Sequence, residues 1–428
     1  MATTVDGLVS GMSTSTMISQ LMQIEAAPQT RLKTKVSDAQ SVVTAYQSVN
    51  TKISALKTAA DSLGQLSTWR GVKPVASSTS VTATATAGST NTATGSITFD
   101  VVALAKAQVS TARVASEGNV TGGATLTVTT GTGDPVAIDI SADQSAQGIS
   151  DAINAAGLSV KASVVKTGSG DSVLQFTGTK TGAENAFTVE GLDFDVKTAV
   201  AASDATLQVG GSSEEGGYSV TSSTNTFTGL MSGVTLTATK LETGVTVDVS
   251  ADTSGIADKI KAMVDAANDL LTEVGKQTAF NAGTGKGSTL TGDFTVRQIS
   301  QAVLSTVSQG QSDLGSLSKI GIELDRSGKL TFKKETFEAA YKADPGTIQT
   351  AGLSFAETVE NLTIKQTADV TNAVTGRKSY IDSMNAQIDN WDIRLSARQE
   401  ALTKQYASLE TALSNLKSQS SYLSSQLG

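Results

Sequence analysis

Two glycine-rich segments carry residue types that could bind phosphate or a metal ion. GTGKGS at 283–288 has part of the spacing of a phosphate-binding loop, but Gly287 follows the lysine where Ser or Thr is required, and Phe280 stands where the first glycine belongs. GSGD at 168–171 has the form of a calcium-binding repeat but occurs once, whereas such sites need stacked copies. We therefore expect no phosphate site and interpret GSGD as a hairpin turn.

The other candidates for catalysis are carboxylates. Glu214 and Glu215 are adjacent, but glycine pairs on both sides make the segment too flexible to hold them, so we interpret it as an exposed loop tip. LDRSGKL at 324–330 has the form of a strand, a turn and a strand, not of a catalytic elbow. Cysteine and histidine are absent, which removes thiolate nucleophiles, the commonest neutral-pH base and most transition-metal ligands. We expect no enzyme, no cofactor and no metal site.

Charge and composition exclude further classes. The net charge is −8 and the pI is about 4.8, so we expect no basic surface for nucleic acid or anionic lipid. The first basic residue is Arg31, so the amino terminus lacks a secretory signal pattern, and no stretch reaches membrane-spanning length. We therefore expect no membrane insertion and, if the protein is exported, another route. The 428 residues predict two to four domains, and 4% aromatic content favours thin layers and helix seams.

The strongest pattern in the chain is a seven-residue repeat near the carboxy terminus. No glycine occurs from Arg377 to Leu427, which favours a long helix. The repeat consists of Ile381, Ile388, Leu395, Leu402, Leu409, Leu416 and Leu423. Met384 and Trp391 fill the companion position of the heptad, but the next four such positions hold Arg398, Gln405, Ala412 and Gln419. The apolar seam therefore narrows toward the tip.

The amino-terminal segment carries a matching pattern. Apolar residues with four- and three-residue spacing run through Leu32, Val36, Ala39, Val43 and Tyr46, and after a stagger through Val49, Ile53, Leu56, Ala60 and Leu63. Pro28 is expected to start this helix, after a shorter helix that carries Met17, Leu21 and Ile24. The residues that we expect to pair helices and to join subunits are Leu21, Ile24, Leu32, Val36, Val43, Tyr46, Ile53, Leu56, Ile381, Ile388, Trp391, Leu395, Leu402, Leu409, Leu416 and Leu423.

The stripe has two interpretations that can hold together: a helix pair inside one subunit, and contact between subunits. Each buried leucine gains about 1.5 to 3 kcal/mol, whereas fixing each residue costs roughly 1 to 2 kcal/mol before hydrogen bonding helps. One narrow stripe cannot hold some fifty residues alone. We predict that residues near 1–40 and 385–428 are loosely ordered in the free protein and become firm helices when packed on neighbours.

The middle of the chain changes to a period of two. Segments such as 81–85, 125–128 and 245–249 alternate as strands do, while 145–156 has helical spacing. Helical spacing returns at 256–274, and a further helix is expected at 296–307. The helical segments on either side of the β middle lack enough apolar surface separately, so we expect them to share one core. The β middle is then an insertion.

The expected architecture is an α+β multidomain chain, with an antiparallel helical or coiled-coil leg formed by both termini, a helical core domain and inserted β-rich head domains. The leg is expected to consist of flexible amino-terminal helices at 1–40 and a carboxy-terminal helix at 385–428. The helical core is expected at 41–73 and 254–384. The first β head domain is expected at 74–114 and 205–253, with a second head domain inserted at 115–204.

Over nearly its full length the chain resembles the bacterial flagellar filament cap family, also called flagellar hook-associated protein 2. The most specific block is GLVSGMSTSTMISQLMQIEAAPQTRL at 7–32, and further blocks lie at 145–165, which looks like a motif shared with flagellins and hook proteins, and at 223–239, 292–303 and 324–332. Two departures are visible: Ser13 stands where the family usually has Asp, and Ala267 stands where an aromatic residue is common. Serine can still cap a helix; the second departure affects local packing.

The resemblance implies a secreted protein at the distal tip of the flagellar filament, exported by the flagellar type III pathway. It implies a homo-oligomeric ring, most often a pentamer, that retains exported flagellin and promotes its folding and insertion, with no cofactor. Flagellin, the hook-filament junction proteins and a flagellar export chaperone are the implied partners. The alternatives are a flagellin or hook-filament junction protein, which would form filaments by itself, and a surface adhesin of the flagellar tip, which would bind host glycans.

Overall fold

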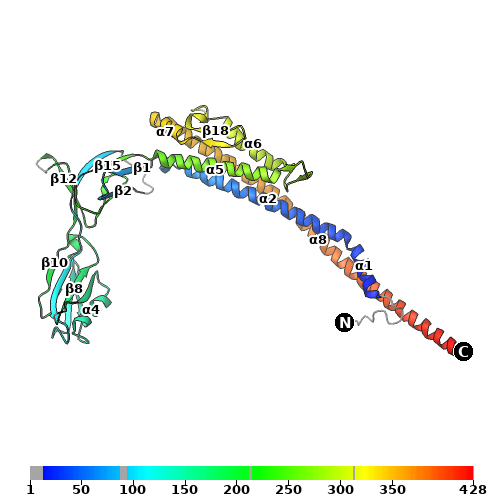
Figure 1. Cartoon of the computed structure of the whole chain (residues 1–428), viewed down its shortest axis with the longest axis horizontal. Coiled ribbons are helices and arrows are strands. Elements are labelled where there is room, and N and C mark those ends of the chain that lie inside the picture. Colours follow the sequence, from blue (N-terminus) through cyan, green and yellow to red (C-terminus); the bar gives the residue numbers. More distant parts are fainter. Residues whose placement is uncertain (1–12, 87–93, 169, 212–214, 312–313, 428) are drawn as a thin grey trace. The chain divides into compact units, whose positions relative to one another are not determined.

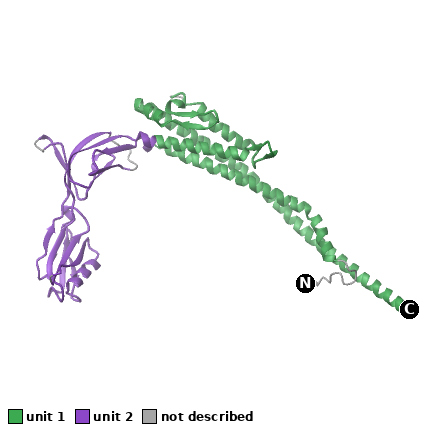
Figure 2. Ribbon diagram, viewed as in Figure 1, with its two compact units in different colours: residues 1–65, 257–428 green, residues 66–256 purple. Residues whose placement is uncertain are grey.

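The computed structural model describes residues 13–86, 94–168, 170–211, 215–311 and 314–427. The chain divides into two compact units: a helical unit of residues 1–65 and 257–428, and a β unit of residues 66–256 (Figure 2). The chain therefore enters the helical unit, leaves it for the whole β unit, and returns. This insertion, together with the helices formed by both chain ends, confirms the expected fold class.

The helical unit is built on two long antiparallel helices. Its larger helices are α1 (Thr14–Glu25), α2 (Ala27–Gly64), α5 (Thr253–Thr278, which begins in the β unit), α6 (Phe294–Ser308), α7 (Lys334–Ala343) and α8 (Pro345–Leu427). Its small elements are β16 (Phe280–Asn281), β17 (Lys286–Gly287), η3 (Leu317–Ile320), β18 (Ile322–Leu324) and β19 (Leu330–Phe332). In Figure 1, α2 and α8 lie side by side, and α6 and α7 also contact α8.

Local sequence explains where several helices begin. Pro28 occupies the first turn of α2, where its missing N–H costs nothing. The Asp293 carboxylate accepts a hydrogen bond from the Val296 N–H and caps α6. Ser13 stands at the cap position of α1, but its hydroxyl bonds the Thr16 hydroxyl at 2.7 Å and makes no side-chain capping bond to the helix. The helices predicted at 256–274 and 296–307 are confirmed as α5 and α6.

The β unit contains two lobes with separate apolar cores. It begins with the short helix α3 (Leu66–Trp69). The first lobe holds the sheet β1-β15-β3-β11-β12 and the sheet β13-β14-β2, made from β1 (Val72–Ala76), β2 (Val81–Ala85), β3 (Gly95–Ala103), β11 (Ala205–Val209), β12 (Tyr218–Ser222), β13 (Thr226–Met231), β14 (Val234–Ala238) and β15 (Glu242–Ala251). Phe99, Leu207 and Val247 are buried at its centre. β1 pairs antiparallel with β15, so Val72 lies opposite Ala251.

The second lobe is inserted between β3 and β11. It holds the sheets β10-β4-β8-β7 and β6-β5-β9, made from β4 (Val109–Ala115), β5 (Thr125–Thr130), β6 (Val136–Asp139), β7 (Val160–Lys166), β8 (Asp171–Gly178), β9 (Phe187–Glu190) and β10 (Lys197–Val200), with α4 (Ala146–Ala155) and the turn η1 (Ala183–Asn185). Leu126, Ile149 and Phe176 are fully buried in its core. β4 pairs with β8 along its whole length. The domain boundary that we expected between residues 114 and 115 therefore falls inside this strand. The domain boundaries remain predictions.

Backbone contacts join the two lobes. Lys106 and Ser203 form an antiparallel bridge where the chain passes from one lobe to the other. The Thr181 hydroxyl donates to the Ser223 carbonyl at 2.7 Å. Gly182 has a φ of +101°, and a Cβ there would lie 2.5 Å from the Ser223 Cβ. Glycine is therefore required at 182 by both conformation and space.

Candidate assembly interface

The seam between α2 and α8 has an apolar cluster in the middle of the leg. Val36, Ala39 and Val43 of α2 pack with Ile381 and Met384 of α8. All five side chains are buried, and Ile388 packs against the cluster as a half-buried residue. The heptad positions of the two chain ends thus meet within one chain, although they lie more than 300 residues apart in sequence. This is the intramolecular part of the expected pairing.

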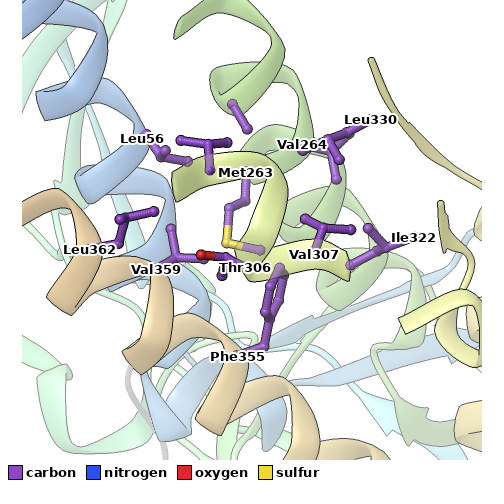
Figure 3. A pocket seen from close by; sticks show the side chains of 12 residues that line it. Leu56, Met263, Val264, Thr306, Val307, Ile322, Leu330, Phe355, Val359 and Leu362 are labelled. Atoms are coloured by element: carbon purple, nitrogen blue, oxygen red, sulfur yellow. The ribbon is translucent and has the colours of Figure 1, made fainter. Parts of the chain in front are cut away.

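Toward the carboxy-terminal end of α2, predicted residues enter the core of the helical unit. Tyr46, Ile53 and Leu56 are 3%, 0% and 1% exposed. Leu56 lines a small apolar cavity together with Met263, Val264, Ala267, Val303, Thr306, Val307, Ile322, Leu330, Phe355, Val359 and Leu362 (Figure 3). Ala267, noted as a departure in the sequence, forms part of this wall and is 4% exposed. These positions hold one subunit together.

A polar clamp closes the seam beyond the apolar cluster. The Gln29 amide donates to the Asp392 carboxylate at 2.5 Å and, with a longer contact of 3.4 Å, to the Ile388 carbonyl. Gln29 is only 6% exposed, so its amide is held between the helices. One turn further along, Arg398 pairs with Glu25 at 2.9 Å. A buried polar side chain in a helix seam favours one register, because any shift leaves it unpaired.

Sequence reasoning missed Gln29 although a signal was present. Gln29 lies seven residues before Val36 and fourteen before Val43, so it occupies the same heptad position. A pattern defined by apolar residues does not reveal an amide at that position. Its partner Asp392 lies next to Trp391 of the carboxy-terminal stripe, where the Arg394 guanidinium stacks 4.7 Å from the Trp391 ring centroid.

Toward the tip of the leg, the predicted residues are largely uncovered. Leu32, Trp391 and Leu395 are half-buried, and Leu402 is 6% exposed. By contrast, Leu21, Ile24, Leu409, Leu416 and Leu423 are exposed in the single chain. We call these five residues the exposed ridge. Large apolar side chains in a row at helical spacing mark a surface that a partner can cover.

The hydroxyl of Tyr46 links α2 to the beginning of α6. It donates to the Asp293 carboxylate at 2.5 Å, while the other oxygen of that carboxylate caps α6. Burial, followed by the hydrogen bond to Asp293 and the negative charge of Asp293, raises the pKa of Tyr46 to about 12. Tyr46 was expected only as an apolar seam residue, so its polar role is an addition from the structure.

Two of the candidate segments form turns. GTGKGS overlaps the β16–β17 hairpin, and the Asp325 carboxylate in LDRSGKL accepts bonds from the Ser327 and Lys329 N–H groups in the β18–β19 turn. Of GSGD, residue 169 lies outside the described residues, as does Glu214. Among the described residues, no group of three or more acidic side chains is placed to hold a metal ion. Within the same residues, no helix has the length and apolar character that crossing a membrane requires.

Comparisons with known proteins agree over most of the chain. Three family models match: flagellar hook-associated protein 2 C-terminus at residues 202–418, flagellar hook-associated protein 2 N-terminus at 10–108, and the flagellin hook IN motif at 125–180. The flagellar hook-associated protein 2 of Escherichia coli K12 is 28% identical over 98% of this chain and 97% of its own length. The A-type flagellar hook-associated protein 2 of Pseudomonas aeruginosa is 27% identical over 100% and 97%. A crystal structure of the flagellar cap protein FliD D1-D2-D3 domains from Escherichia coli aligns with a TM-score of 0.61 and 27% identity, covering 78% of this chain and 99% of that one.

Proposed function

Because this chain belongs to the flagellar hook-associated protein 2 family, we propose that it is the structural cap at the distal end of the flagellar filament. In this role it retains exported flagellin at the tip and promotes its folding and insertion. The similarity to a flagellar cap protein across nearly all of that protein's structure is the observation that carries the proposal. The protein acts outside the cell, at the filament tip.

The arrangement of the chain supports a mechanical role. Both ends form one antiparallel helix pair whose apolar cluster and polar clamp fix its register, while the exposed ridge is left for other molecules. The β unit is a separate body with its own two cores. A leg that contacts the filament and a head that closes its end need no catalytic site.

The finer features follow from the same proposal. Copies of the chain assemble into a ring, for which five subunits is our expectation, and the sixteen predicted apolar residues divide between two tasks. The buried ones, such as Val43 and Ile381, pair α2 with α8. The exposed ridge contacts neighbouring legs and the outermost flagellin, and before assembly an export chaperone covers it. Hook-filament junction proteins are contacted before the first flagellin is added.

Deletion of the gene tests the function directly. We expect the mutant to secrete flagellin monomers into the medium and to carry hooks with no filament, and we expect the gene supplied on a plasmid to restore filaments. Normal filaments in the deletion strain would overturn the proposal. If the purified protein polymerised into long filaments by itself, the alternative of a flagellin or junction protein would replace it.

A further inference from the structure

The acidic character of the chain is confined to the β unit. Residues 66–256 hold nine lysines and arginines and seventeen aspartates and glutamates, whereas the rest of the chain holds twenty-three of each. The whole net charge of −8 therefore belongs to the β unit. A cationic surface on this unit is an exception to its composition and points to a specific partner.

One outer face of the second lobe is such a surface. In the sheet β10-β4-β8-β7, the alternate residues Ala112, Leu174 and Ala162 face the core, so their neighbours face outward. The outward set is cationic: Lys197 on β10, Arg113 on β4 and Lys161 on β7 are all exposed. The register surrounds them with Thr111, Ser163, Val165, Val173, Gln175 and Thr177, and with one carboxylate, Asp171, at the end of β8. We call this the basic face.

The other sheet of the same lobe presents an acidic face. In β6-β5-β9, the residues Leu126, Ile138 and Phe187 face the core. The opposite side carries Asp139 and Glu190, both exposed, among Thr125, Thr127, Thr129, Ala137 and Thr188. None of these outward strand residues is a cation. The Ser141 side chain and N–H bond to Asp139 and hold the pKa of its carboxyl below the usual value, so it is charged near neutral pH.

We propose that the basic face of one copy docks on the acidic face of the next copy. The inference rests on the proposed ring and names the surfaces that form part of it. Arg113 and Lys161 are two strand spacings apart, across β8, and Asp139 and Glu190 are two strand spacings apart, across β5. Along the strands, Arg113 and Lys161 are offset by four residues of β8, and Asp139 and Glu190 are offset by two residues of β5. At the backbone the two pairs are therefore about 17 Å and about 12 Å apart, a difference that the long side chains of arginine and lysine can span, so both cations can reach a carboxylate. The hydroxyl and amide side chains around them supply neutral hydrogen-bonding partners.

Charge complementarity favours a second copy over other occupants. The two faces lie on different sheets of one lobe, so a single copy cannot bring them together. Contact between two different faces is heterologous, so it joins subunits head to tail. Such a series of subunits closes into a ring when the rotation between neighbouring subunits allows it. An acidic polymer could meet the basic face alone, but it would leave the acidic face without a role. The experiment below separates these cases.

The test uses the full chain and charge reversal on each face. The basic-face variant carries Arg113→Glu and Lys161→Glu, and the acidic-face variant carries Ala137→Lys and Glu190→Lys. A control matched to the basic-face variant carries Lys73→Glu and Lys240→Glu, which lower the net charge by the same amount on exposed residues of the first lobe. Sedimentation velocity at 50 and 500 mM NaCl measures assembly, and circular dichroism verifies the fold of each variant.

We expect each face variant alone to assemble about tenfold more weakly than wild type at low salt. In an equal mixture the two variants should associate with each other, because the altered basic face of one matches the altered acidic face of the other, although a ring with an odd number of subunits cannot alternate them. The control is expected to assemble like wild type. Equal assembly of all proteins, or a chain that is monomeric at every concentration, overturns the inference. Loss of assembly in the basic-face variant alone, with retention of wild-type protein on an anionic polysaccharide column, overturns it in favour of an acidic polymer. The proposed cap function is judged separately, by flagellin secretion from the deletion strain.

Discussion

Replacement of Tyr46 by phenylalanine removes one hydroxyl and tests whether α2 and α6 are held together as described. The hydroxyl donates to a carboxylate at 2.5 Å, and Tyr46 is 3% exposed. A hydrogen bond to a charged group contributes about 1.5 to 3 kcal/mol. Asp293 keeps its hydrogen bond from the Val296 N–H in the variant, so the loss of stability should lie near the lower end of that energy range. We expect Tyr46→Phe to lower the free energy of unfolding of the helical unit by about 1.5 kcal/mol.

The same change should alter the dependence on pH. The pKa of Tyr46 is raised from 10.0 in the unfolded chain to about 12 in the folded protein. Its contribution is therefore complete below pH 10 and is lost as the pH rises toward 12, because the unfolded chain releases the proton first. Between these values, wild type should lose stability with pH more steeply than Tyr46→Phe. The two curves should converge at the alkaline end.

Urea unfolding followed by circular dichroism at 222 nm measures both effects, at pH 7 and at several values up to pH 11.5. The matched control is Tyr380→Phe, since Tyr380 also lies on a helix of this unit but is 48% exposed. The control should change the unfolding midpoint little, because about half of its side chain is exposed. If Tyr46→Phe behaves like the control in both respects, the reasoning about this contact is wrong.

Three further results are expected. The double variant Leu395→Asp and Leu402→Asp should leave the β unit folded but reduce swimming in soft agar to that of the deletion strain. The control, Ser396→Asp with Ala401→Asp on exposed positions, should swim normally. Normal swimming by the first double variant would show that the leg is not needed for the mechanism. In dilute monomer, amides of residues 13–40 and 385–427 should exchange with deuterium faster than those of α5. After assembly, the same amides should exchange more slowly than in the monomer. Uniform slow exchange in the monomer would contradict the predicted loose order. Leu56→Ala should cost about 3 kcal/mol by urea unfolding, because Leu56 is 1% exposed, while a loss below 1 kcal/mol would show a core that collapses around the site.

Periodicity predicted the helices α2, α4, α5, α6 and the carboxy-terminal part of α8, and strands within β2, β5 and β15. The spacing of Ile381 and Ile388, and of Val36 and Val43, depends only on the side of a helix that faces a partner, so it can be read without the partner. Glycine placement likewise separated the helical ends from the β middle. The pairing of the two ends followed because neither stripe could be buried alone.

Other features depend on distance in space and have no local signal. Tyr46 and Asp293 are 247 residues apart, and no pattern in either segment indicates that a hydroxyl of one meets the cap of the other. The heptad treats Leu402 and Leu409 alike, yet Leu402 is 6% and Leu409 is 45% exposed. The order of strands β1-β15-β3-β11-β12 requires pairings between segments that are remote in sequence, which alternation alone does not select.

The pairing of β1 with β15 has a consequence for the order of folding. Val72 and Ala251 lie opposite each other at the two ends of the β unit, and the Asp252 N–H also donates to the Gly71 carbonyl. Closing a flexible segment of that length costs about 4 to 5 kcal/mol of chain entropy. Once the β unit has folded, that cost is already met, and α5 starts within a few ångströms of the chain that leaves α2. Docking of α5 and α8 on α2 then becomes a short-range search, because the folded insert already holds the two halves of the divided helical sequence close together.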